Sequence, residues 1–389
     1  MNKILTQSKD SQLLNRIGEI LTIARQHTVQ TVNTILVKTY WEVGREIVEF
    51  ELGGKTRAEY GKGMLQNLSK ELTIRYGKGF THSNLRRMRQ FYFTYQIHAT
   101  LSHKLENPIM QSESAQSNGG EILSTLSREL ENPTVQSLSE KAVLSEKMLT
   151  KLSWSHICLL LAVSDKDARS FYEIEIANNS WSVRESKRQI ESMLFERLAL
   201  SKDKKGLKQL AEKGQIIEMP EDALKDPYVL EFLGLDEKEK WLESDLEQAL
   251  MNHLQKFLLE LGKGFMFVAR QYRISINNEH YHIDLVFYNK ILRSYVLIDL
   301  KTSKFDHSDF GQMKFYLNYF KEEMNDKGDN EPIGIVLCYD KDDTFVEYVL
   351  KDEKQIFAKK YLISLPDKKL LLAEIEKTRI EFESEPKIK

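Results

Sequence analysis

The chain has 389 residues, a formal net charge of −2, and hydrophobic and aromatic shares of 41 % and 10 %. These values exclude a chain that is disordered throughout and a uniformly basic, histone-like protein, although they allow a local basic patch. The length predicts about two or three domains. The two cysteines are far apart, which argues against a disulfide framework or a zinc site and favours a reducing, cytoplasmic location. No apolar run approaches the length of about 18 residues that a membrane span needs.

Residues 1–100 are expected to form a helical domain. Apolar side chains recur at helical spacing over residues 10–50 and predict two long helices. A third helix is expected to end at Gly77, because glycine readily adopts the backbone conformation that closes a helix. Thr81 or Ser83 can then cap the start of a fourth helix.

A basic segment lies within this helical region. Residues 55–96 contain nine basic side chains and two acidic ones. Most of them fall on two predicted helices joined by a short turn with glycines, which is the order of a helix-turn-helix. The segment is interpreted either as a DNA-binding motif or as a solvated basic helix face. The DNA contacts predicted for it are Lys78, Asn84, Arg86, Arg87 and Arg89.

The middle of the chain contains a duplication. Residues 101–108 and 126–133 have closely related sequences that begin 25 residues apart, and each copy ends in Asn-Pro. The sequence around them is rich in Ser, Gln and Gly, which predicts a largely flexible insertion over residues 101–150. Residues 151–225 are expected to continue the helical region and to end in a linker.

Residues 226–389 change period and predict a mixed α/β domain in which helices cover a sheet. The expected order is a helix, three strands, a helix, a strand, a short helix, a strand and a final helix. Their expected ranges are 244–261, 265–276, 281–288, 294–300, 309–321, 333–339, 343–350, 356–363 and 367–380.

Two carboxylates and a lysine stand out in this domain. Side chains alternate between the faces of a strand, so Asp299 and Lys301 should point the same way while Leu300 enters the core. The loop at 288–293 would fold two strands into a hairpin and bring Asp284 close to Asp299. Adjacent carboxylates repel each other unless a cation or a proton joins them. Mg²⁺ is a suitable cation because it prefers carboxylate, water and phosphate oxygens.

A metal held there could activate water against a phosphodiester, and the lysine could orient or deprotonate that water or neutralise phosphate charge. The alternative is a strand-end aspartate beside an ordinary ion pair. His280 and His282 should share the strand face of Asp284, either as polar strand residues or as metal ligands. Gln312 and Tyr316, four residues apart, should share one helix face.

The order of these residues resembles a PD-(D/E)XK nuclease core with the QxxxY element of its RecB-like branch. The chain is more closely similar to the YhcG-type PD-(D/E)XK nuclease family, over nearly its whole length apart from the insertion and the termini. The matching stretches lie at 152–156, 181–185, 226–233, 254–265, 270–272 and 283–288.

This resemblance implies an α/β restriction-endonuclease-like domain after a mainly α-helical, winged-helix or helix-turn-helix-like domain used for DNA recognition or assembly. It implies Mg²⁺, with Mn²⁺ as a substitute, as the cofactor. By this resemblance, Asp284 and Asp299 would be metal ligands and Lys301 would be the catalytic lysine. Glu247 would be an accessory acid that binds the metal through water or holds Lys301. Gln312 and Tyr316 would position the DNA or the active-site loop.

The chain departs from the family pattern at two positions. Ile283 replaces the proline before the first aspartate, a change that is not disabling. Asp299 stands where related proteins often carry glutamate, and its shorter side chain would shift the metal. Metal preference and rate therefore stay open.

The predicted function is a metal-dependent DNA endonuclease that hydrolyses phosphodiester bonds. One active centre cuts one strand, so double-strand cleavage needs either a dimer or a second cutting event, and a homodimer is predicted. Two alternatives remain: a catalytically silent DNA-binding or assembly protein, and a nuclease for another substrate, such as an RNase or a structure-specific resolvase. The sequence lacks a Walker-type loop and therefore does not support ATP use, and it does not identify a partner protein.

Overall fold

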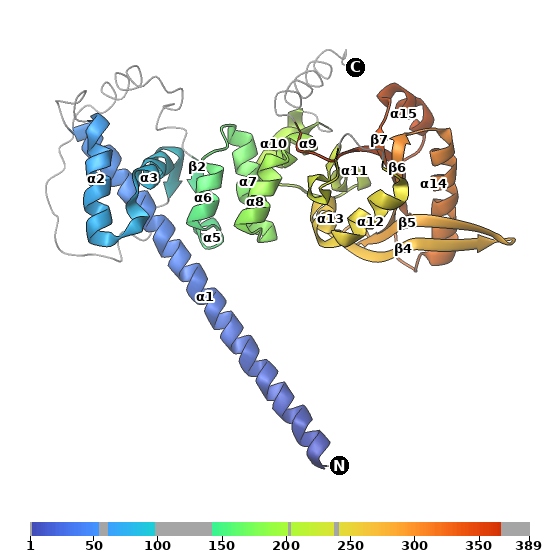
Figure 1. Cartoon of the computed structure of the whole chain (residues 1–389), viewed down its shortest axis with the longest axis horizontal. Helices are drawn as coiled ribbons and strands as arrows, with labels where there is room; N and C mark the ends of the chain where they lie inside the picture. The colour runs from blue at the N-terminus through green and yellow to red at the C-terminus, as the bar shows by residue number, and fades with distance from the viewer. Residues whose placement is uncertain (1, 54–60, 98–141, 201–203, 237–240, 367–389) are drawn as a thin grey trace. The chain divides into compact units, whose positions relative to one another are not determined.

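The computed structural model describes residues 2–53, 61–97, 142–200, 204–236 and 241–366, which form two compact units (Figure 1). The first unit is Met1–Ser186 and the second is Lys187–Lys389. Most of the predicted insertion and the predicted last helix lie outside the described residues. Within the described ranges, no helix combines the length and the apolar content needed to cross a membrane.

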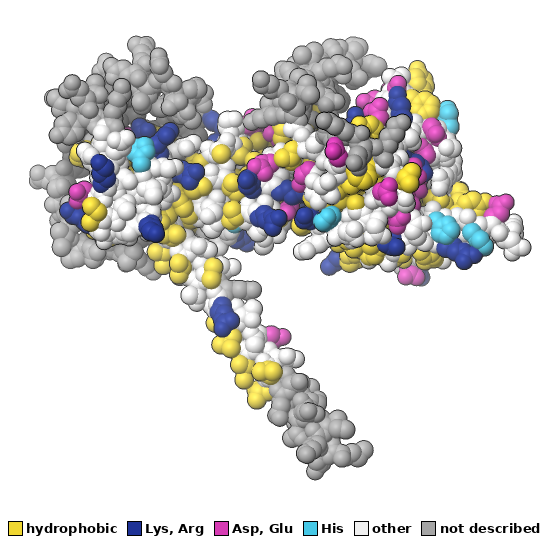
Figure 2. Space-filling view, in the orientation of Figure 1, with side chains coloured by type: hydrophobic (Ala, Val, Ile, Leu, Met, Phe, Trp, Pro, Cys, Tyr) yellow, Lys and Arg dark blue, Asp and Glu magenta, His cyan; other side chains and the backbone are white. Residues whose placement is uncertain are grey.

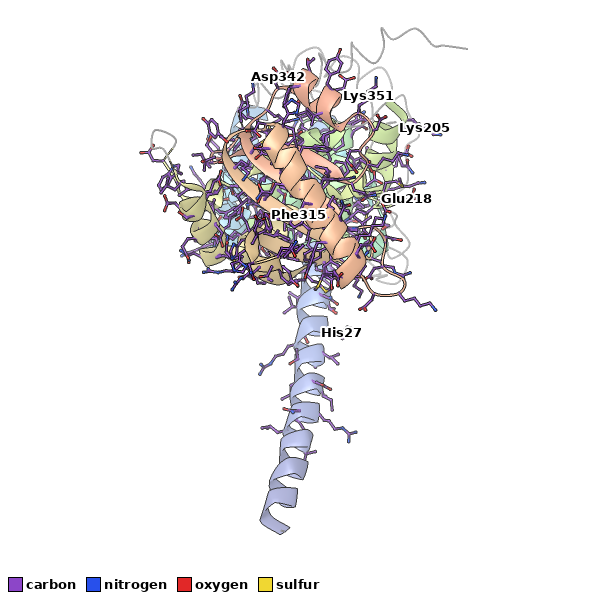
Figure 3. All side chains as sticks on the ribbon, turned by 90° about the vertical axis from the view of Figure 1, so that its right-hand side faces the viewer. His27, Lys205, Glu218, Phe315, Asp342 and Lys351 are labelled. Atoms are coloured by element: carbon purple, nitrogen blue, oxygen red, sulfur yellow. The ribbon has the colours of Figure 1, made fainter. Side chains whose placement is uncertain are left out.

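The first unit begins with one continuous helix, α1 (Asn2–Gly53), where two helices were predicted. No proline interrupts this stretch, so a helix-breaking signal is absent. Side chains near its C-terminal end pack into the unit, and Val37 and Val48 are buried. Large apolar side chains nearer the N-terminus are exposed, on the part of α1 where Figure 3 labels His27.

Two further helices complete this part of the unit. Helix α2 (Gly61–Tyr76) ends at Gly77, which has a φ of 91° as expected for a closing glycine. The short turn η1 (Lys78–Phe80) leads to α3 (His82–Thr94), which is capped by the Thr81 side chain. Helix α3 buries one apolar face, made by Leu85, Met88 and Phe91.

Helices α1 and α3 cross closely at Gly44. A Cβ atom at Gly44 would lie 2.1 Å from the carbonyl oxygen of Met88, closer than atoms can approach. Glycine is therefore required at this crossing. No such limit applies to Gly18 of the same helix, where a Cβ atom would meet nothing within 4 Å.

After the residues that are not described, the structure resumes at residue 142 with a short strand. Strand β1 (Tyr95–Ile97) pairs in parallel with β2 (Ala142–Leu144), and α5 (Glu146–Leu149) follows. Leu144 and Leu149 are fully buried. The prediction of a flexible insertion up to residue 150 was therefore wrong for residues 142–150, because these apolar side chains join the core.

Helices α6 (Trp154–Leu160) and α7 (Lys166–Asn179) continue the helical region, as expected, and the Ser153 side chain caps α6. A break separates α8 (Val183–Glu191) from α9 (Leu194–Ala199). The break falls at Met193, whose φ of 56° is incompatible with a continuous right-handed helix.

The second unit is a mixed α/β domain, which confirms the predicted fold class of this region. Its helical elements are α10 (Lys204–Lys213), α11 (Pro220–Ala223), η3 (Glu231–Leu233), α12 (Glu243–Asn252), α13 (Leu254–Leu261), α14 (His307–Tyr319), η4 (Phe320–Met324) and α15 (Asp343–Leu350). Its strands are β3 (Tyr228–Val229), β4 (Phe265–Ile276), β5 (Glu279–Asn289), β6 (Ser294–Lys304), β7 (Ile333–Asp340) and β8 (Ile356–Leu362). The helix predicted for 244–261 is divided into two at His253.

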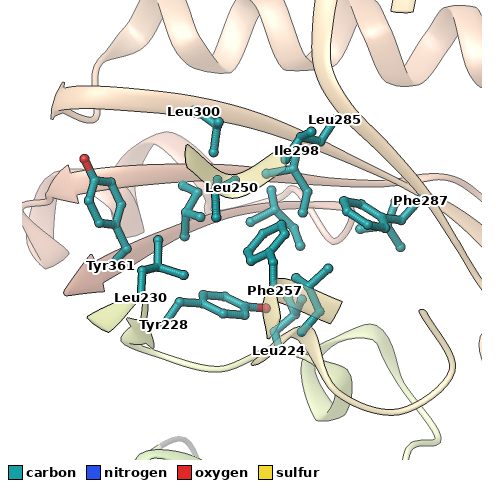
Figure 4. Close-up of a cluster of buried hydrophobic side chains, with 14 of the residues drawn as sticks. Leu224, Tyr228, Leu230, Leu250, Phe257, Leu285, Phe287, Ile298, Leu300 and Tyr361 are labelled. Atoms are coloured by element: carbon teal, nitrogen blue, oxygen red, sulfur yellow. The ribbon is translucent and has the colours of Figure 1, made fainter. Parts of the chain in front are cut away.

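The strands form one six-stranded sheet in the order β3-β8-β7-β6-β5-β4. Strands β3, β8, β7 and β6 are parallel neighbours, while β6-β5 and β5-β4 are antiparallel pairs. Two cores cover the faces of this sheet. One contains Phe257 of α13 with Phe287 and Leu300 (Figure 4), and the other contains Met313 of α14 with Val336.

A buried ionic network ties α8 and α9 to this unit. Glu260 of α13 is fully buried and pairs with Arg197 Nη1 at 2.6 Å and with Arg188 Nη2 at 3.1 Å. The backbone N–H of Val229 also donates to Glu260. The unit consequently begins at residue 187, whereas the predicted nuclease domain began at residue 226.

Candidate active site

The structure brings together the two aspartates and the lysine that the strand pattern selected. Asp284 lies on β5, and Asp299 and Lys301 lie on the neighbouring strand β6. Oδ2 of Asp284 accepts a hydrogen bond of 2.8 Å from the backbone N–H of Leu300, between the other two residues. The Nζ atom of Lys301 is 2.9 Å from Oδ2 of Asp299. Leu300 itself is fully buried in the core, as alternation predicted.

Burial makes the negative charge on both aspartates unfavourable. Only 3 % of Asp299 is exposed, and burial together with the charge of Asp284 raises the pKa of Asp299 to about 6. Burial also raises the pKa of Asp284, although hydrogen bonds from Leu300 and Gln271 oppose this effect. Two such carboxylates would be stabilised by a cation placed between them.

Lys301 is surrounded by acids. Among the described residues, its Nζ atom is also 3.8 Å from Glu243 and 3.9 Å from Asp309. Burial lowers the pKa of Lys301, but Asp299, Glu243 and Asp309 outweigh that effect and raise it above its usual value. The side chain is therefore held as an ammonium ion. An ammonium ion can neutralise charge on a phosphate or orient water, whereas only the neutral amine can accept a proton.

Glu247 connects to the site through Gln271, a residue to which the sequence analysis assigned no role. Nε2 of Gln271 donates to Glu247 at 2.8 Å and to Asp284 at 2.9 Å. The backbone of Gln271 has a φ of 47°, a left-handed conformation that is unfavourable for a residue with a side chain. Burial and the charge of Asp284 raise the pKa of Glu247.

The acid of α12 that lies next to Lys301 is Glu243, one helical turn before Glu247. The resemblance had implied Glu247 for this contact. Residues four apart share a helix face, so the spacing alone gave no reason to prefer either acid. Asp309 could have been noticed, because Asp306 and Asp309 form a reciprocal capping pair at the start of α14.

Gln312 and Tyr316 share a face of α14, and together they form a hydrogen-bond chain to the backbone of β5. Nε2 of Gln312 donates to the Tyr316 hydroxyl at 2.6 Å. That hydroxyl donates to the backbone carbonyl oxygen of His282 at 2.8 Å. Because His282 precedes Asp284 by two residues, this pair helps to fix the strand that carries the first aspartate.

The donor set fits a hard divalent cation. Within the described part of the chain, no group of three His, Cys, Asp or Glu side chains is arranged to hold a metal ion. Mg²⁺ often takes only one or two protein carboxylates and fills its other positions with water and substrate oxygens. Asp284 and Asp299 supply two such carboxylates, and their raised pKa values show charge that lacks full compensation.

The residues predicted to bind DNA in the first unit fall into two groups. Asn84 is committed to internal contacts, because it donates to the Gly79 carbonyl oxygen at 2.6 Å and accepts from Trp154 at 2.9 Å. Arg89 pairs with Glu51 at 2.7 Å. The predicted contacts whose side chains are exposed are Lys78, Arg86 and Arg87.

A sheet that pairs two aspartates on neighbouring strands with a lysine two residues after the second defines a nuclease core of the PD-(D/E)XK class. The YhcG PDDEXK nuclease domain matches residues 221–376, and the DUF1016 N-terminal domain matches residues 16–110 and 101–197. "Putative nuclease YhcG" of Escherichia coli (strain K12) is 41 % identical over 377 residues, which cover 96 % of this chain and 95 % of that protein. The chain therefore belongs to the YhcG family of PD-(D/E)XK nucleases, as the sequence motifs indicated.

Two solved structures show a partial likeness. One is described as a repair endonuclease from Pyrococcus abyssi, with 23 % identity over 33 % of this chain and 50 % of that chain, and a TM-score of 0.24. The other, described as an EndoMS-dsDNA2 complex, has 19 % identity over 34 % of this chain and 50 % of that chain, also with a TM-score of 0.24. Scores this low support no conclusion about function.

Proposed function

We propose that the protein is a metal-dependent endonuclease that hydrolyses phosphodiester bonds in DNA. The observation that carries this proposal is the contact set at β5 and β6. Asp284 is bonded to the backbone between Asp299 and Lys301, and it raises the pKa of Asp299 through its charge. Such a pair of desolvated carboxylates beside an ammonium group suits a divalent cation and a phosphate.

Each side chain of the site has a separate task in this proposal. Asp284 and Asp299 would hold Mg²⁺ or Mn²⁺, which acidifies water and stabilises negative charge on phosphate when it is bound. Lys301 would neutralise the phosphate as an ammonium ion. Gln271 would keep Asp284 and Glu247 at a fixed separation, and Tyr316 would fix β5.

The test is nicking of supercoiled plasmid DNA with Mg²⁺ or Mn²⁺. Wild type is expected to nick, while Lys301→Ala and Asp299→Ala should lose nicking at least about 100-fold, the usual cost of removing a charge-stabilising group. Lys290→Ala is the matched control, because Lys290 is an exposed lysine directly after β5. Circular dichroism verifies folding. Equal activity of Lys301→Ala and wild type would contradict the proposal.

Running branched DNA and RNA beside the plasmid separates the alternative substrates. Preference for branched DNA would indicate a resolvase, and preference for RNA an RNase. Wild type that binds DNA but cleaves none of these substrates in either metal would support the alternative of a silent binding or assembly protein.

For the first unit we propose DNA contacts through the exposed side chains of Lys78, Arg86 and Arg87. These residues lie on η1 and α3, and Arg86 and Arg87 follow the capped start of the helix. Arg86→Ala should weaken DNA binding severalfold and lower its salt dependence by about one counterion. An unchanged salt dependence would favour the solvated basic face.

We also propose a homodimer formed through α1. Leu14, Ile17 and Leu21 recur at three- and four-residue spacing, and their exposed fractions are 69 %, 45 % and 51 %. An exposed apolar stripe with this spacing suits pairing with a second, identical helix. Leu21→Asp should give a monomer by size-exclusion chromatography with light scattering, whereas Arg16→Asp on the opposite side of the helix should not. Wild type that is monomeric at every concentration would refute the dimer.

A further inference from the structure

The outer part of the β4–β5 hairpin is not paired with strand β6 of the site. Strands β4 and β5 pair from the turn inward, with Arg273 opposite His282 and Ser275 opposite His280. Strand β5 pairs with β6 only from Leu285 onward. The outer part of the hairpin therefore separates from β6, and Figure 1 shows it as the arm that carries the labels β4 and β5.

The two faces of this arm differ in composition. One face packs on α14: Ile274 is fully buried, and the rings of Tyr281 and Phe315 are 4.7 Å apart. The opposite face is polar, and its outer residues are exposed. We call it the hairpin face, and its residues are Gln271, Arg273, Ser275, His280, His282 and Asp284.

Hydrogen bonds organise the hairpin face. Nη2 of Arg273 is 2.8 Å from Nε2 of His280, and the Oγ atom of Ser275 is 3.1 Å from Nδ1 of the same ring. A guanidinium group can only donate, so Nε2 accepts and the ring proton lies on Nδ1, toward Ser275. Both ring nitrogens of His280 are thereby engaged, which leaves neither for a metal. Arg273 has five N–H donors, and this bond uses one of them.

The hairpin face carries one carboxylate, that of Asp284 in the site, and one fixed positive charge, the guanidinium of Arg273. Its outer part, from Arg273 to the turn, is therefore positively charged. Glu279, the acid near the tip of the arm, is turned to the other face, where it accepts a hydrogen bond from the Tyr281 hydroxyl. Figure 2 shows histidine and basic side chains gathered on this arm.

We propose that the hairpin face binds the phosphate backbone of duplex DNA next to the phosphate that is cut. This inference rests on the proposed endonuclease function. The face begins at Asp284 and continues to His280 without a break, so a backbone leaving the site meets Arg273 directly. The four residue steps from Asp284 to His280 span about 13 Å. That length matches about four base-pair steps of 3.4 Å.

The chemistry of the face favours a phosphate backbone over an apolar partner. Arginine presents planar pairs of donors that match phosphate oxygens, and it gives up its hydration more readily than lysine does. The opposite face of the arm is anchored on α14, and Tyr316 bonds the carbonyl oxygen of His282. The arm is therefore held in place before a ligand arrives, which reduces the entropy lost on binding.

The test measures binding of the full-length protein to a labelled duplex DNA of about 30 base pairs, in EDTA, at roughly 50 to 200 mM NaCl. Arg273→Ala should weaken binding severalfold and reduce the slope of log K against log salt by about 0.9. Arg273→Lys should restore the slope, because it keeps the charge. Lys290→Ala is the matched control. Each counterion adds to the slope separately, so contacts elsewhere on the chain do not hide the loss.

The outcomes separate this proposal from the endonuclease. The proposed DNA contact is supported if the salt slope of binding falls in Arg273→Ala but not in Arg273→Lys or Lys290→Ala. This holds even if wild type nicks no plasmid. Arg273→Ala and Lys290→Ala with the same slope would overturn it, even if wild type is an active nuclease. Dependence on Arg273 for duplex RNA but not for duplex DNA would also overturn it.

Discussion

Removing one cation from the buried network around Glu260 should destabilise the second unit strongly. Glu260 is fully buried, and burial alone would raise its pKa, but Arg197, Lys225 and Arg188 lower it from 4.5 to about 2. A difference of this size corresponds to about 3 kcal/mol of folding free energy. Removing one partner of a buried ion pair typically costs about 3 to 5 kcal/mol. Arg197→Met should therefore lose about 3 kcal/mol at pH 7.

The pH dependence of the wild type follows from the same pKa. Because folding lowers the pKa of Glu260, its contribution is fully present above about pH 4.5 and is lost as the pH falls toward 2. Glu260→Gln should remove this part of the acid sensitivity. Since the amide side chain introduced by this change carries no charge, the stability of the variant should not respond to the protonation of this position.

Hydrogen exchange measured by mass spectrometry on peptides from α13 reports the opening free energy of this unit separately from the first. Lys187→Met is the control, because Lys187 pairs with Glu191 at 3.5 Å on the surface. Such an exposed pair should contribute less than about 1 kcal/mol. If Arg197→Met changes the opening free energy no more than Lys187→Met does, the network does not stabilise the unit as argued.

Three further changes test other contacts. Tyr316→Phe should lose about 1 kcal/mol locally, because the hydroxyl that bonds the His282 carbonyl oxygen is removed, and exchange at the β5 amides should rise about fivefold. Gly44→Ala should lower the stability of the first unit by about 2 kcal/mol through overpacking, while Gly18→Ala should raise it slightly; calorimetry that finds equal effects would refute the close crossing. Gln271→Gly should be about 1 kcal/mol more stable than Gln271→Ala in chemical unfolding, because only glycine relieves the left-handed backbone.

Strand alternation predicted the centre of the site well. It placed Asp299 and Lys301 on one side of a strand and Leu300 in the core, because side-chain direction in a strand depends only on parity. The hairpin loop then limited where Asp284 could lie. Both inferences use local rules, and local rules can be read from a single sequence.

The residues that were missed depend on tertiary structure. Gln271 lies within β4 with a left-handed backbone, and glutamine itself gives no signal for that conformation. Helix periodicity cannot decide between Glu243 and Glu247, which share a face. The apolar pattern predicted two helices where α1 is continuous, although no proline interrupts residues 10–50.

The ionic network around Glu260 has a consequence for how domains of this family can be recombined. Arg188 and Arg197 lie within the stretch that matches the DUF1016 N-terminal domain, while Glu260 lies in the stretch that matches the nuclease domain. A chimera joined between residues 197 and 221 would take Glu260 from one parent and its two arginine partners from the other. A chimera that keeps this network intact must therefore take residues 187–220 from the same parent as the nuclease domain.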